Sequence, residues 1–171
     1  MNRARLVALR TDRLEENGSI LYYCSMHIYT IGFTQKPAQT FFDLVRGEDI
    51  STVFDVRLNN VSQLAGFAKK DDLAFFLDRL CGVDYVHMPE LAPTAELLQG
   101  YRKRVLTWPQ FEEAFLNLMA QRNMERSIDS ATLDKGCLLC SEHKPHHCHR
   151  RLVVDYLNQH ADVALTVRHL Y

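Results

Sequence analysis

Five short apolar runs punctuate the chain, and segments with a helical spacing of apolar residues separate them. The runs predict strands over His27–Gly32, Thr52–Val56, Asp84–Met88, Gly136–Cys140 and Val163–His169. The spacing predicts helices over Pro37–Arg46, Asp71–Leu80, Ala95–Arg104, Pro109–Arg122 and Cys148–Gln159. Strands that alternate with helices favour βαβ units, and nearly continuous apolar strands suit a sheet covered on both faces. The pattern therefore predicts an α/β domain with a mostly parallel sheet of about five strands.

The first 25 residues have a different pattern. Asp12, Glu15, Glu16, Asn17 and Gly18 form a polar stretch without helical or strand periodicity. We therefore expect residues 1–25 to be a flexible or loosely docked N-terminal extension, and residues 26–171 to be a single α/β domain. Met26 directly precedes the first predicted strand, so it is a candidate translation start.

The amino-acid composition limits the class of protein to which this chain can belong. Hydrophobic residues make up 47% and charged residues 24% of the 171 residues, as in ordinary globular proteins. The net charge of -1, from 20 Lys and Arg against 21 Asp and Glu, gives no overall basic signature for nucleic acid, although a local basic patch stays open. No apolar run approaches the roughly 20 residues of a membrane span, and the N-terminus lacks the pattern of a signal peptide. Five cysteines, three of them within 137–148, indicate reduced thiols and a cytoplasmic protein.

Polar side chains gather where the predicted strands end. Gly32 ends the first strand, Asp55 and Arg57 the second, Glu90 follows the third, and Glu142 follows the fourth. Ligands of open parallel sheets bind outside the carboxyl ends of the strands. We therefore expect these residues to meet in one hollow.

The densest cluster is CLLCSEHKPHHCHRR, residues 137–151, and one interpretation of it is a metal site. Its potential ligands are Cys137, Cys140, His143, His146, His147, Cys148 and His149, which carry the groups that zinc prefers. The Cys137-x-x-Cys140 spacing is typical of zinc sites, but residues three apart on a strand point to opposite faces. Cys137 is therefore expected in the core, and no set of metal ligands is assigned.

A second interpretation places chemistry at the start of the last helix. The partial positive charge of a helix N-terminus attracts anions and lowers the pKa of a thiol such as Cys148. Arg150 could hold a phosphate or carboxylate, and His149 or His143 could transfer a proton. A third interpretation is that the loop only caps the helix and ties the strands together.

Four blocks of sequence resemble one known family. They are YTIGFTQKP, FDVRLNNVSQLAGFAKKDDLAFFL, YVHMPELAPT and CLLCSEHKPHHCHRRLVVDYL, in that order. Together they closely resemble the domain of unknown function 488 family, from about Ile28 to Leu170. The resemblance implies a compact Rossmann-like, three-layer α/β fold and no assigned reaction. It implies motif positions at Tyr29, Gly32, Asp55, Arg57, His87, Pro89, Glu90, Cys140, Glu142, Cys148, His149 and Arg150.

Two better-known Cys-based classes fit less well. The DVR block is similar to one in rhodanese-type sulfurtransferases, but their single Cys heads a short loop, whereas the loop here is longer and rich in His. A Cys-based phosphatase loop is excluded, because no Cys is followed by Arg six positions later.

The leading hypothesis is an enzyme that acts on an anionic, phosphate-bearing small molecule or a nucleic-acid component. Its catalytic candidates are Cys148, Cys140, His149, His143 and Glu142, and its anion-binding candidates are Arg57, Arg150, Asp55, Gly32 and Glu90. Within this set, a Cys is the reactive thiol, a His carries the proton, the two arginines clamp the anion and Asp55 or Glu142 orients a partner. The alternative is a metal- or nucleic-acid-binding module without turnover. The sequence identifies no cofactor.

Overall fold

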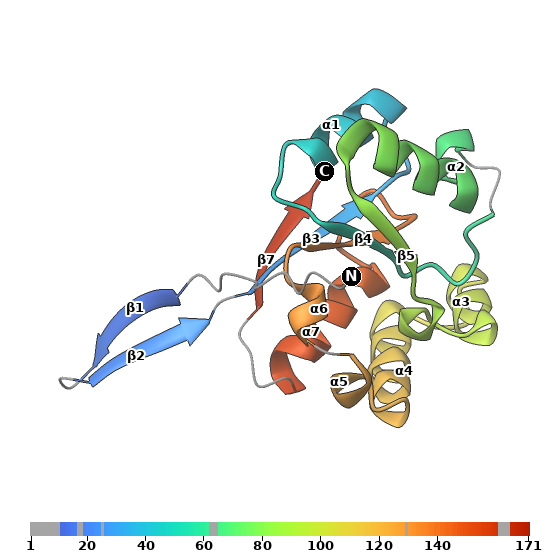
Figure 1. The fold of residues 1–171 in the computed structure, drawn as a ribbon. Helices are drawn as coiled ribbons and strands as arrows, with labels where there is room; N and C mark the ends of the chain where they lie inside the picture. The colour runs from blue at the N-terminus through green and yellow to red at the C-terminus, as the bar shows by residue number, and fades with distance from the viewer. Residues whose placement is uncertain (1–10, 17–18, 25, 62–64, 129, 161–164) are drawn as a thin grey trace.

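The computed structural model describes residues 11–16, 19–24, 26–61, 65–128, 130–160 and 165–171, with the side chains of all of these from residue 26 onward except residue 130. Its main element is a five-stranded sheet in which every pairing is parallel. The strands are β3 (Met26–Gly32), β4 (Thr52–Asp55), β5 (Asp84–His87), β6 (Gly136–Cys140) and β7 (Leu165–Leu170), in the spatial order β5-β4-β6-β3-β7 (Figure 1). The predicted α/β class, three-layer arrangement and parallel sheet are confirmed.

Helices cover both faces of this sheet (Figure 1). One face carries α1 (Ala38–Arg46), η1 (Gly66–Ala68), α2 (Lys70–Phe76) and the π-helical η2 (Leu77–Cys81). The other carries η3 (Pro89–Leu91), α3 (Ala95–Arg102), α4 (Trp108–Gln121), α5 (Met124–Ser127), α6 (Ser130–Leu133) and α7 (His149–His160). Each layer encloses its own hydrophobic core, so the central strands β3, β4 and β6 are buried on both faces.

Alternation along β6 decides which of its residues can reach the site. Cys137 and Leu139 belong to the core under α1 and α2, whereas Leu138 belongs to the core under α4 and α7. Cys140, three positions after Cys137, contacts His149 of α7. The prediction that Cys137 is a core residue, separate from Cys140, is confirmed.

The connections of β4 and β6 create an opening at the carboxyl edge of the sheet. After β4 the chain turns to α2 on one face, and after β6 it turns to α7 on the other. Such a divergence between neighbouring strands is a topological switch point, where open α/β sheets leave a crevice.

The N-terminal segment contains two strands that the sequence pattern did not predict. Thr11–Glu16 (β1) and Ser19–Cys24 (β2) pair as an antiparallel two-stranded sheet, where no strand periodicity was expected. The Asn17-Gly18 dipeptide between them is a sequence signal for a two-residue hairpin turn. Residues 1–10, 17–18 and 25 lie outside the described residues, and the division at residue 26 stays a prediction.

Candidate functional site

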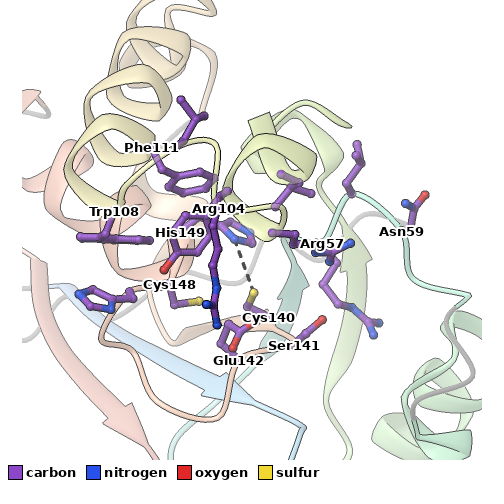
Figure 2. A pocket seen from close by; sticks show the side chains of 16 residues that line it. Arg57, Asn59, Arg104, Trp108, Phe111, Cys140, Ser141, Glu142, Cys148 and His149 are labelled. Atoms are coloured by element: carbon purple, nitrogen blue, oxygen red, sulfur yellow. Dashed lines mark hydrogen bonds between the residues drawn. The ribbon is translucent and has the colours of Figure 1, made fainter. Parts of the chain in front are cut away.

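A cavity of about 380 Å³ lies at the carboxyl ends of β4 and β6, as the switch point predicts (Figure 2). Residues that follow β4 form one side, and the end of β6 with the start of α7 forms another. Helices α3 and α4 and the loop between them complete the wall. The lining residues are Arg57, Leu58, Asn59, Leu98, Tyr101, Arg102, Arg104, Leu106, Trp108, Phe111, Cys140, Ser141, Glu142, His147, Cys148 and His149.

A cysteine–histidine pair lies at the base of this cavity (Figure 2). Cys140 ends β6 and His149 is the first residue of α7, with Cys140 Sγ 3.6 Å from His149 Nδ1. His149 Nε2 lies 2.8 Å from the carbonyl oxygen of Val56, just after β4. A carbonyl oxygen can only accept a hydrogen bond, so His149 Nε2 carries a proton and donates it to this oxygen. His149 Nδ1 is then directed to the Cys140 thiol. The pair therefore has the arrangement of a nucleophile with an oriented base.

The surroundings of Cys140 favour its thiolate. Hydrogen bonds from Cys148 and His149, and the charge of His149, hold the pKa of Cys140 well below its usual value despite burial. Burial opposes the charged form of His149, but the charge of Cys140 and the hydrogen bond to it raise the pKa of His149. Each group thus stabilises the charged form of the other, and the site favours a thiolate–imidazolium pair.

Cys148, immediately before α7, is the neutral partner of this pair. Its hydrogen bond to Cys140, together with burial, raises its pKa well above the usual value. Arg150 Nη1 donates to Cys148 Sγ at 3.3 Å, which fixes the position of the thiol. Of the two predicted reactive thiols, the geometry therefore favours Cys140 over Cys148.

Arg57 and Asp55 form a buried ion pair beside the cavity. Arg57 Nε and Nη2 donate to the two Asp55 oxygens at 2.7 and 2.6 Å, and Nη2 also donates to the Ala68 carbonyl at 2.9 Å. Tyr85 donates its hydroxyl to Asp55 at 2.7 Å. Arg57 is 3% exposed, and its Nη1 has no hydrogen-bond partner within the described part of the chain. A buried cationic donor without an acceptor is costly, so this atom is suited to receive an anion.

Arg150 fixes the loop 141–148 through hydrogen bonds. Its guanidinium is fully buried and donates to Thr30 Oγ1, to the carbonyls of Glu142 and His143, and to Cys148. Gly32 allows this packing, because a Cβ at residue 32 would lie 1.7 Å from the Glu142 oxygen. Arg150 and Gly32, which were predicted to bind the anion, therefore shape the loop, and neither of them lines the cavity.

The family model for the domain of unknown function DUF488 matches residues 37–157 of the chain. The chain belongs to the DUF488 family. No curated protein and no solved structure matches it. Among the described residues of this DUF488 protein, no helix is both long and apolar enough to cross a membrane.

The predicted site residues of this DUF488 protein do not all meet in the cavity. Glu142 lines it, whereas the His143 ring lies outside its lining and pairs with Lys36 Nζ at 3.0 Å. Glu90 is exposed in η3, and its side chain is not among those that line the cavity. Asp55 is fully buried behind Arg57, so it orients the arginine and has no free face for an anion.

Sequence reasoning missed the wall opposite Cys140. Tyr101, Arg102 and Arg104 are not among the predicted site residues, but all three line the cavity. Trp108 begins α4, where the Gln110 side chain accepts from the Thr107 N–H in a capping arrangement. The Thr107-x-x-Gln110 spacing before an apolar run is the sequence signal that could have placed the start of α4, and with it Trp108.

Three residues of the DUF488 site could also hold a metal ion. Cys140 Sγ, Cys148 Sγ and one ring nitrogen of His149 lie within 4.8 Å of one another. Two thiolates and an imidazole form a known zinc ligand set, and the hydrogen bond from His149 Nε2 to Val56 would orient that ligand. The cavity would leave a further coordination position open to a small molecule.

Proposed function

We propose that this DUF488 protein is a thiol-dependent enzyme that acts on a small, phosphate-bearing or otherwise anionic molecule. Cys140 is the nucleophile, His149 carries the proton and Arg57 binds the anion. One observation carries the proposal: a cysteine–histidine pair and a buried arginine with an unpartnered Nη1 line the same cavity.

The proposed step is nucleophilic displacement at the ligand. The Cys140 thiolate attacks an electrophilic carbon or phosphorus atom, which forms a bond to Sγ and breaks the bond to a leaving group. His149 gives its Nδ1 proton to that leaving group and is then neutral, with Nε2 still donating to Val56. Hydrolysis of the covalent intermediate, with His149 as the base, returns the thiolate and the imidazolium.

The lining of the cavity favours a ligand with an apolar or ring-shaped body as well as an anionic group. Leu98, Tyr101, Leu106, Trp108 and Phe111 supply an apolar and aromatic wall. Arg102 and Arg104 are exposed residues that also line it, so two more cations lie near the opening. A volume of about 380 Å³ lies in the usual range for small-molecule sites. A nucleotide or another component of nucleic acid has this combination of ring and phosphate.

The experiment is a protection assay that does not require the reaction to be known. Purified full-length protein is labelled with iodoacetamide in the presence of nucleoside monophosphates, sugar phosphates or dicarboxylates, and Cys140 labelling is measured by peptide mass spectrometry. Ligands of the site should slow Cys140 labelling in the unmodified protein and not in Arg57→Gln. Arg79→Gln, an exposed arginine of η2, is the control. Any protecting compound is then tested for conversion.

The proposal fails if no anionic compound protects Cys140, or if protection is equal in Arg57→Gln.

The thiols of this site must be reduced, and this requirement fits the cytoplasm as the expected compartment.

A metal-binding module is the second candidate, favoured by the three ligand atoms within 4.8 Å of one another. Zinc measured in protein purified without a His tag separates the two candidates. One equivalent of zinc per chain, lost in Cys140→Ser and in Cys148→Ser, supports the module. A metal-free protein whose Cys140 labels readily supports the thiol enzyme.

A further inference from the structure

Cys140 and Cys148 lie close to each other as well as to His149. Their Sγ atoms lie within 4.8 Å of each other. Both cysteines are free in this structure. Both also line the cavity, which gives a small oxidant a route to this end of the site.

We propose that Cys140 is a site of oxidation by peroxides and that Cys148 resolves the oxidised thiol into a Cys140–Cys148 disulfide. This modification goes beyond the proposed function and does not depend on any substrate. A disulfide would remove the thiol that the proposed reaction needs, so the oxidised protein would be inactive until a thiol reductant restored it.

The chemistry takes two balanced steps. The Cys140 thiolate attacks one oxygen of the peroxide, so an S–O bond forms, the O–O bond breaks and Cys140 becomes a sulfenic acid. The departing oxygen anion takes a proton from His149. The Cys148 thiol then attacks the Cys140 sulfur, so the S–S bond forms and the S–O bond breaks. The hydroxyl group leaves as water with the Cys148 proton.

The contacts of the two cysteines suit these different roles. Cys140 has the imidazole of His149 at 3.6 Å, which favours the attacking thiolate. Cys148 is held 3.3 Å from Arg150 Nη1, a cation that stabilises its thiolate once its proton leaves. A disulfide requires the sulfurs to approach to about 2.05 Å, so one or both of these side chains must move as the bond forms.

Neither of the other described cysteines has such an arrangement. Cys137 is fully buried on the opposite face of β6, and burial raises its pKa. Cys81 is half-buried in η2 and donates to the carbonyl of Phe42. Burial also raises the pKa of Cys81, so neither thiol is activated.

Peptide mass spectrometry tests this assignment on the full chain. The protein is treated with hydrogen peroxide, with and without prior dialysis against a chelator, then alkylated and digested with trypsin. Cleavage after Lys135 and Arg150 leaves Cys137, Cys140 and Cys148 in one peptide, and fragmentation shows which pair is joined. The expected product is Cys140–Cys148, formed before Cys81 is oxidised and reversed by dithiothreitol.

Variants separate the two roles. In Cys148→Ser, Cys140 should stop at the sulfenic acid and be trapped by dimedone, whereas Cys81→Ser should still form the disulfide. A Cys140–Cys137 product would overturn the inference. The inference would also be overturned if the Cys140 and Cys148 thiols were both unchanged after peroxide treatment of the metal-free protein. The two proposals can fail separately. If the Cys140–Cys148 disulfide forms but no anionic compound protects Cys140, this inference is upheld and the proposed function is contradicted.

Discussion

The backbone oxygen of Glu142 occupies the space that a side chain on Gly32 would need. A Cβ at residue 32 would come within 1.7 Å of that oxygen, which Arg150 Nη1 also contacts. The end of β3 therefore fixes the path of the loop that connects Cys140 to α7. The shape of the candidate site depends on this close approach between two segments that are far apart in the sequence.

The Gly32→Ala substitution should displace the loop 141–148. Since the clash is with backbone, relief requires the loop to move, and we expect a loss of stability near the upper end of the about 1–3 kcal/mol typical of overpacking. Denaturant unfolding measures the loss, and Cys140 alkylation reports on the site. Gly66→Ala is the matched control, because a Cβ there meets nothing within 4 Å. Equal stability of the two variants would contradict the role given to Gly32.

The Arg150→Met substitution should destabilise the protein far more than Arg151→Met. Arg150 is fully buried and donates to two loop carbonyls and to Cys148, and a hydrogen bond to a charged group contributes about 1.5–3 kcal/mol. Arg151 pairs with Asp155 and Glu112 at the surface, where ion pairs contribute about 1 kcal/mol or less. We expect at least about 3 kcal/mol for Arg150→Met. Chemical denaturation measures both variants, and similar losses would show that Arg150 does not hold the loop.

His169 should make the protein less stable in mild acid. Burial, and then the charge of Arg150, lower the pKa of His169 in the folded state below 6.5. The unfolded chain thus binds more protons than the folded chain as the pH falls through about 6.5, and stability is lost there. Replacement by Gln removes this group, so the drop in melting temperature from pH 7.5 to 5.5 should be smaller in His169→Gln. An unchanged drop would show that His169 does not contribute to it.

Arg57 should bind inorganic phosphate through its free Nη1. Phosphate in millimolar amounts should raise the melting temperature of the unmodified protein and not that of Arg57→Gln, because that change removes the unpartnered donor. Arg79→Gln should keep the full shift, since Arg79 is exposed on η2. The same shift in all three proteins would indicate a general salt effect and would contradict an anion site at Arg57.

The fold could be predicted from the sequence because its signals are local. Each of the five strands of the sheet is an apolar run, and the observed bounds differ from the predicted ones by at most two residues. The hairpin of β1 and β2 was missed because the polar residues around Asn17 dominated the pattern, although Asn-Gly is itself a turn signal. Only the tertiary structure shows that β6 lies between β4 and β3.

The structure brings predicted residues from the strand ends together in one cavity, and their catalytic and binding roles stay predictions. Cys140 and Arg57 were expected to meet because parallel strands end at one edge of a sheet, and His149 was expected at the start of the last helix. The buried role of Arg150 was missed because its position in a Cys-His-Arg triplet does not show that its partners are carbonyls of the preceding loop. Tyr101 reaches the cavity where α3 packs against α4, through a contact with Phe111 that has no local sequence signal.

The most direct test of the account is the pH dependence of Cys140 alkylation, followed by peptide mass spectrometry from pH 4 to 10. A pKa held well below the usual value predicts rapid alkylation of Cys140 at a pH where Cys81 and Cys137 do not react. In His149→Gln the Cys140 midpoint should shift towards the value of an ordinary thiol, about 8.5. A Cys140 that titrates like an ordinary thiol in the unmodified protein, or a midpoint that His149→Gln leaves in place, would contradict the thiolate–imidazolium pair.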